Sequence, residues 1–170
     1  MRISTTFLFA SVLATATAHA APPPAPADAR PALLKALDGD WVMTGDVMGK
    51  PVRYNMAATP ALNGTFTEMH MKDVQVPAKY EARVFIGYDQ GSQAVIAHWM
   101  DSFGAKGSIP HATGKMTDHT IEFTFPYASA PFRDTLSYQP ESASWTLEIE
   151  SAKPDGTWKH FARYEIHRPQ

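Results

Sequence analysis

The stretch VIAHWMDSFGA, at positions 95 to 105, sets four side chains of chemical interest side by side: His98, Trp99, Met100 and Asp101. Together they would suit a catalytic or a ligand-binding constellation. Successive residues of a β-strand point to opposite faces, however, so one strand cannot bring all four together. The hairpin pairing described below predicts that Trp99 and Asp101 face inward and that His98 and Met100 face outward.

A second pair, Asp134 and His160, is predicted to meet inside the fold. Both are expected on inward faces of strands separated by one other strand, about 9.6 Å apart at the backbone. A histidine oriented by a carboxylate is a general base, and the same contact also satisfies a buried histidine. No serine in a nucleophile elbow and no oxyanion partner accompanies the pair. The sequence therefore favours a non-enzyme and leaves catalysis through His160 and Asp134 open.

Metal and phosphate chemistry have weaker signals in the sequence. Glu68 and His70 form an E-x-H pair, but the predicted pairing turns both outward, and a zinc site needs three or four ligands. The segment GAKGS at 104 to 108 lacks the G-x-x-x-x-G-K spacing of a phosphate-binding loop. We therefore expect no metal site.

The elements that must position these residues are short strands. From Asp40 onward apolar residues recur with period two, and turn signals such as Asn63-Gly64 and Gln90-Gly91 interrupt the pattern every 8 to 14 residues or so. The pattern predicts an all-β fold, a single closed up-and-down antiparallel barrel of about ten strands. A short helix over residues 31 to 37 is expected before it.

Residues that face each other in a hairpin share one side of the sheet, so each turn fixes which side chains point inward together. Five turns predict a common interior. The predicted pairs are Met43 with Tyr54, Trp41 with Met56, Ala58 with Met69, Met56 with Met71, Ile86 with Val95, Val84 with Ala97, Ala82 with Trp99, Tyr80 with Asp101, Phe125 with Phe132, Phe123 with Asp134, Ile121 with Leu136, Ile149 with His160, Leu147 with Ala162 and Trp145 with Tyr164.

An apolar interior with few polar groups is typical of a small-molecule pocket, in which burial supplies affinity and fixed polar groups supply orientation. The alternative is that the same side chains fill the barrel completely. The predicted ligand-binding residues are Trp41, Met43, Tyr54, Met56, Met69, Met71, Trp99, Asp101, Phe123, Phe125, Asp134, Trp145, His160 and Tyr164.

Four motifs carry a resemblance to known proteins: GDW at 39 to 41, LNGTF at 62 to 66, GYD at 87 to 89 and WMDSFG at 99 to 104. The first resembles the G-x-W of lipocalin-like calycin barrels, and the whole pattern is similar to an uncharacterised bacterial family of exported lipocalin-like domains. That resemblance implies a barrel with a ligand cavity, plugged at one end by the tryptophan. A late arginine, Arg163 or Arg168, is expected to stack on Trp41.

The resemblance also raises haem as a cofactor, because another branch of ten-stranded calycin-like barrels binds haem through a histidine on a late strand. His160 is the inward histidine of the predicted pairing, and Met69 or Met71 could face it as a soft ligand. That branch's motif is not matched here, so the expectation is no cofactor, with haem as the alternative.

The N-terminus predicts an exported protein. Residues 1 to 20 combine Arg2, an apolar stretch and an A-x-A site, which is typical of a signal peptide cleaved after Ala20, and a Pro-rich linker over 21 to 31 precedes the domain at 32 to 170. The chain contains no cysteine, which excludes disulfides and thiolate chemistry. No later segment reaches about 18 consecutive apolar residues, so no membrane span is expected.

The formal net charge, −2 for the full chain, predicts no affinity for nucleic acid or anionic lipid. The expected function is a periplasmic or secreted binding protein that holds a small apolar or amphipathic molecule. The haem protein and the enzyme remain alternatives, as does a solid barrel that binds a partner through outward-facing Phe85, Ile96 and Met100. The oligomeric state does not follow from the sequence.

Overall fold

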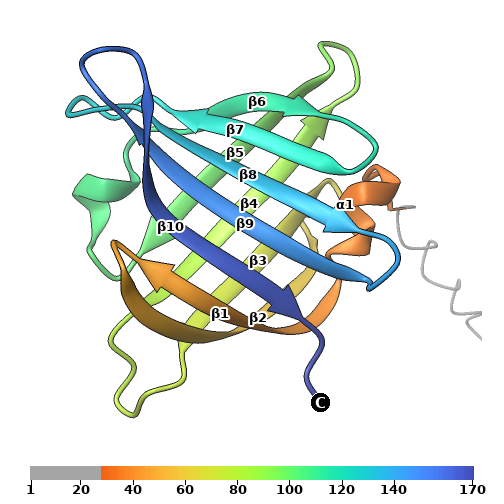
Figure 1. The fold of residues 1–170 in the computed structure, drawn as a ribbon. Coiled ribbons are helices and arrows are strands. Elements are labelled where there is room, and N and C mark those ends of the chain that lie inside the picture. The colour runs from red at the N-terminus through yellow and green to blue at the C-terminus, as the bar shows by residue number, and fades with distance from the viewer. Residues whose placement is uncertain (1–27) are drawn as a thin grey trace, which may run out of the picture.

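A computed structural model describes residues 28–170; the predicted signal peptide and most of the predicted linker lie outside the described residues. The described part forms a closed antiparallel barrel of ten strands, each hydrogen-bonded to its neighbours in the sequence, with β1 closing on β10 (Figure 1). The all-β barrel prediction is confirmed. The strands are β1 (Gly39–Val47), β2 (Lys50–Ala61), β3 (Phe66–Asp73), β4 (Glu81–Asp89), β5 (Ala94–Asp101), β6 (Ala112–Met116), β7 (Thr120–Phe125), β8 (Phe132–Gln139), β9 (Ser144–Ala152) and β10 (Trp158–His167).

One end of the barrel is closed by the helix α1 (Ala32–Ala36), on the right in Figure 1. Leu33 and Leu34 of this helix are buried with the barrel core. The Trp41 indole lies beneath it and donates a 2.6 Å hydrogen bond to the Leu37 carbonyl. Arg168 caps the indole, with its guanidinium carbon 3.5 Å from the ring centroid. The predicted stack on Trp41 is therefore confirmed, and Arg168 supplies it.

Alternation of apolar side chains sets the register of most hairpins. β1 with β2, β2 with β3 and β7 with β8 pair as predicted, for example Trp41 opposite Met56. Between β4 and β5 the register differs by two residues, so Trp99 lies opposite Val84. A shift of two residues preserves the facing, because side chains alternate with period two. Trp99 thus still points inward, and His98 outward.

The last hairpin differs from the prediction, and His160 is misplaced by it. A β-bulge interrupts the pairing of β9 with β10, so that His160 lies opposite Glu150 and Ala162 opposite Ile149, with Phe161 as the extra residue. Because side chains alternate along a strand, one inserted residue turns the residues of β10 that precede it to the opposite face of the sheet. The prediction that His160 points into the barrel is wrong: its exposed ring bonds Asp46 on the outer face, with 2.9 Å between Nε2 and Oδ2.

The segment before α1 contacts the barrel. Arg30, assigned from sequence to the linker, has a fully buried side chain that bonds Asp28, Asp38 and the Thr67 hydroxyl. The two carboxylates raise the pKa of Arg30, and Arg30 in turn holds the pKa of Asp28 at about 2. Asp28, Arg30 and Pro31, which the sequence assigned to the linker, are thus tied to the barrel or to α1 by hydrogen bonds.

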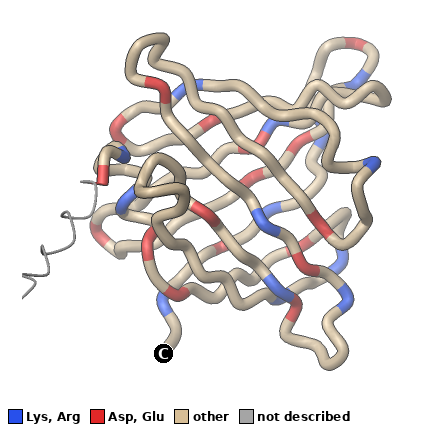
Figure 2. Tube along the Cα trace, turned by 180° about the vertical axis from the view of Figure 1, so that it is seen from behind, with Lys and Arg blue, Asp and Glu red and all other residues tan. Residues whose placement is uncertain are grey.

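Charged residues of both signs are interspersed along the chain of the barrel (Figure 2). Many are paired across neighbouring strands, such as Arg133 with Glu150 at 2.5 Å. Among the residues that the structure describes, no helix is long and apolar enough to cross a membrane.

Candidate ligand cavity at the open end of the barrel

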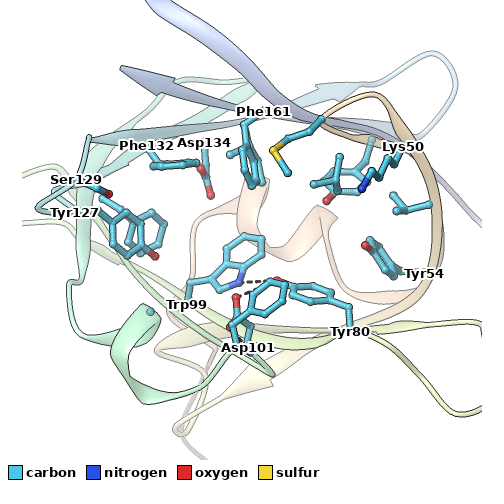
Figure 3. A pocket seen from close by; sticks show the side chains of 18 residues that line it. Lys50, Tyr54, Tyr80, Trp99, Asp101, Tyr127, Ser129, Phe132, Asp134 and Phe161 are labelled. Atoms are coloured by element: carbon cyan, nitrogen blue, oxygen red, sulfur yellow. Dashed lines mark hydrogen bonds between the residues drawn. The ribbon is translucent and has the colours of Figure 1, made fainter. Parts of the chain in front are cut away.

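The end of the barrel opposite α1 is hollow. A cavity of about 450 Å³ lies there, and its mouth is bordered by the β1–β2 turn at Met48, the β5–β6 connection around the 3₁₀ helix η1 (Ala105–Ser108) and the β7–β8 loop at Ser129. Figure 3 shows the side chains that line it. The lining residues are Val47, Met48, Lys50, Val52, Tyr54, Tyr80, Trp99, Asp101, Phe103, Gly107, Phe125, Tyr127, Ser129, Phe132, Asp134, Ile149, Phe161 and Tyr164.

Aromatic rings make up half of this lining, nine residues of 18, and several contact one another. Phe161 packs edge-on against Phe132 at 5.0 Å between ring centroids, and Tyr127 lies 5.7 Å from Phe132. On another part of the wall Tyr54 lies 5.8 Å from Tyr164. These contacts fix the rings in place, so the cavity is formed before a ligand arrives.

Asp134 is the buried charge of the cavity. It lies on β8 between Phe123 of β7 and Ile149 of β9, is 2% exposed, and points into the cavity (Figure 3). Its carboxyl makes no hydrogen bond or ion pair with any of residues 28–170. Burial away from water disfavours the charged form and raises the pKa of Asp134 to about 8. The cavity therefore holds an acid that titrates near neutral pH.

A hydrogen-bonded chain crosses the opposite wall. The Trp99 indole donates to the Tyr80 hydroxyl at 3.1 Å, and that hydroxyl donates to Asp101 at 3.3 Å. Asp101 also accepts a 2.9 Å bond from the Phe103 amide. Burial, with Asp101 next in effect, raises the pKa of Tyr80 above its usual range, so its hydroxyl stays protonated and able to donate. This wall is thus held rigid by its own partners, unlike Asp134.

The fourteen residues predicted from sequence fall into three groups. Six line the cavity: Tyr54, Trp99, Asp101, Phe125, Asp134 and Tyr164. Seven lie in the solid core that fills the closed half of the barrel: Trp41, Met43, Met56, Met69, Met71, Phe123 and Trp145. His160 belongs to neither group: it lies on the outer face, so the predicted contact between His160 and Asp134 does not form.

Sequence reasoning also missed five aromatic residues of the lining: Tyr80, Phe103, Tyr127, Phe132 and Phe161. Tyr80 and Phe132 could have been included, because the predicted pairs already placed them on the inward face, opposite Asp101 and Phe125. Tyr127 and Phe103 lie in connections, where alternation gives no facing. Phe161 was predicted to face outward, because the alternating pattern does not show the bulge between His160 and Ala162.

Histidine does not contribute to this site. Within residues 28–170 no histidine lines the cavity, and no group of three or more His, Asp or Glu side chains gathers in a way that could hold a metal ion. His98 and His111 stack at 5.5 Å between ring centroids outside the cavity. His160, on which both the haem and the enzyme alternatives relied, is therefore not brought to the cavity.

Fold and site together define a closed ten-stranded antiparallel barrel, lipocalin-like in architecture, with a small aromatic cavity at one end. A protein-family model matches residues 27–168, nearly the whole described chain. The chain belongs to this family, which is described as "Protein of unknown function (DUF1579)". No curated protein matches the chain.

Proposed function

We propose that this protein is an exported, lipocalin-like binding protein that holds a small apolar or amphipathic molecule in the cavity at its open end. The observation that carries the proposal is the cavity itself, about 450 Å³ in volume and half lined by aromatic side chains. Small-molecule pockets are typically of roughly 300–1,000 Å³ and predominantly apolar, with a few polar groups. Export is part of the proposal because residues 1 to 20 have the pattern of a signal peptide.

The proposal includes neither haem nor catalysis. Both alternatives required His160 inside the barrel, and that residue bonds Asp46 on the outer face. Asp134 alone offers an acid without the oriented histidine that a general-base mechanism would use. Binding through burial needs no such partner.

The test is a fluorescence titration with N-phenyl-1-naphthylamine, an uncharged probe that brightens in apolar surroundings. We expect saturable binding to the wild-type protein. Val52→Phe narrows the cavity, because Val52 belongs to its lining, and should weaken probe binding by about tenfold or more, since poor fit costs more than a kilocalorie.

The matched control is Val42→Phe. Val42 lies between Trp41 and Met43, which face inward, so its side chain points outward on the neighbouring strand β1. This variant should bind the probe like the wild type. Absence of saturable binding to the wild type, or equal binding to all three proteins, would contradict the proposal.

A further inference from the structure

The charged groups of the cavity differ in depth. Three lining residues carry charge: Asp101, Asp134 and Lys50. Lys50 is exposed and begins β2 at the rim, where water can solvate its ammonium group. Asp134 is buried, and Asp101 is half-buried on the wall across from it (Figure 3). The interior of the cavity therefore carries carboxyl groups and no cation.

Asp134 is the unusual member of this set because it has no partner among the described residues. Asp101 is satisfied by Tyr80 and the Phe103 amide, whereas the Asp134 carboxyl faces open space. A buried polar group without a partner costs free energy, and a buried carboxylate costs much more. A positively charged group entering the cavity would supply the missing partner.

The walls around Asp134 suit such a cation. Phe132 and Tyr127 belong to the same wall region, and Trp99 rises from the opposite wall toward Asp134 (Figure 3). The faces of aromatic rings attract cations, tryptophan most strongly, and cages of such rings bind substituted ammonium groups. A buried carboxylate among aromatic rings therefore offers two attractions to the same charge.

We propose that the occupant of this cavity is an organic cation, a protonated amine or quaternary ammonium group with an apolar tail, whose head pairs with Asp134 among the aromatic rings while its tail contacts the remaining apolar lining. This inference rests on the proposed function and specifies the chemical class of its ligand. The competing class is an anionic amphiphile held by Lys50 at the rim. The buried charge of the cavity favours the cation, because an ion pair strengthens as water is excluded from it.

Titration of Asp134 supports the assignment. The titratable groups that face it are Tyr127, Tyr164 and, farther away, Asp101, and none of them is a cation. Its pKa of about 8 in the empty cavity should fall when a cation binds beside it, so binding should release a proton at neutral pH.

Three eight-carbon molecules test the proposal by displacing N-phenyl-1-naphthylamine: octylamine, octanol and octanoate. They share a tail and differ in the charge of the head. We expect octylamine to displace the probe from the wild type at a concentration about tenfold lower than octanol, with octanoate weakest, since a desolvated ion pair and cation–π contacts add to the same apolar burial.

Asp134→Asn removes the charge and keeps the shape of the side chain. In this variant octylamine should lose its advantage over octanol, while the probe still binds and so reports an intact cavity. Lys115→Gln is the matched control: it removes an exposed charge that does not belong to the cavity lining, and it should leave the order of the three molecules unchanged.

Equal displacement by octylamine and octanol, a preference for octanoate, or an octylamine preference that survives in Asp134→Asn would overturn the inference. So would probe binding that no octylamine concentration reverses. Each of these results leaves the binding function standing, because the probe itself binds. Failure of the probe to bind the wild type would instead overturn the proposed function.

Discussion

Asp134 links the stability of the protein to its proposed function. Asp134 is buried between Phe123 and Ile149 and has no partner, so ionisation of its carboxyl lowers the free energy of unfolding. Binding sites often contain groups of this kind, whose pKa is perturbed because they are arranged for a ligand and not for the empty fold. The same carboxyl should therefore be visible in both a stability measurement and a binding measurement.

Replacing Asp134 by Asn should change stability in a pH-dependent way. The pKa of Asp134 is about 8 in the folded protein against 3.8 for an ordinary aspartate, so the folded state favours the protonated form. The fold is therefore most stable, as far as Asp134 is concerned, below about pH 4, where this carboxyl is protonated in both the folded and the unfolded state. That stability is lost as the pH rises through about 8. Urea unfolding should show wild type and Asp134→Asn alike at pH 4.5, and the variant more stable by a few kilocalories at pH 9.

The control for this prediction is Asp101→Asn, because Asp101 already has hydrogen-bond donors in Tyr80 and the Phe103 amide. It should lose stability at both pH values. If Asp134→Asn were equally destabilising at pH 4.5 and pH 9, the buried and unpartnered state of Asp134 would be wrong.

His160 should be dispensable for binding. Its ring is exposed and bonds Asp46, so His160→Ala removes an exposed side-chain hydrogen bond, an interaction that contributes little. The neighbouring variant Phe161→Ala removes a ring from the cavity wall and should weaken probe binding several-fold. Titrating both variants with the fluorescent probe compares the outward and the inward residue of one bulge. Weaker probe binding by His160→Ala, with unchanged binding by Phe161→Ala, would contradict these positions.

At the scale of elements, alternation and turn residues were sufficient to predict most of the barrel. The Asn63-Gly64 turn and the alternation on both sides of it set the register of β2 with β3 correctly. The turn between β4 and β5 has four residues, and the observed register of these strands differs from the predicted one by two residues. The side chains still face as predicted, because they alternate with period two. The bulge at Phe161 was not predictable, because it is an odd insertion whose support is tertiary: the packing of Phe161 on Phe132.

The candidate site was predictable only in part for a similar reason. Period-two patterning tells which side chains point inward but not how deep along the barrel axis each one lies. Met56 and Tyr54 are neighbours on the inward face of β2 and are both buried, yet only Tyr54 lines the cavity. Where the interior is filled depends on α1 and on connections such as the one that contains Phe103, to which alternation does not apply.

Arg168 should contribute measurably to the closed end. It stacks on Trp41 and donates to the carbonyls of Asp38 and Asp40. Arg168→Ala should lower the free energy of unfolding by about 1–2 kcal/mol, from a cation–π contact and weak hydrogen bonds. Arg163→Ala, which removes only exposed ion pairs with Glu148 and Glu165, should lower it by less than about 0.5 kcal/mol. Chemical denaturation checks both, and equal losses would contradict the stack.

As a whole molecule, the barrel divides its interior along its axis. The half beneath α1 is packed with large side chains such as Trp41, Trp145 and Met71, whereas the other half is hollow. A solid half stabilises the closed sheet, and that stability allows the remaining half to stay open and to carry an unpartnered carboxyl. Sequence reasoning offered a filled barrel or a cavity as alternatives, and each describes one half.

The segment before α1 belongs to the solid half. A chain that begins at Ala32 lacks Arg30 and so leaves Asp38 and Thr67 without their buried partner. It should be less stable than a chain that begins at Asp28, by on the order of 2 kcal/mol, since both carboxylate partners are partly exposed. Thermal unfolding of the two chains tests this, and identical midpoints would return residues 28 to 31 to the linker.

The most direct test of the central claim is the position of a ligand in the hollow half. Crystals grown with 8-bromooctan-1-ol, analysed by bromine anomalous diffraction, should show a bromine peak within the cavity between the walls of Asp134 and Trp99. Bromine peaks found only on the outer face, or a cavity that stays empty at saturating ligand, would contradict the account.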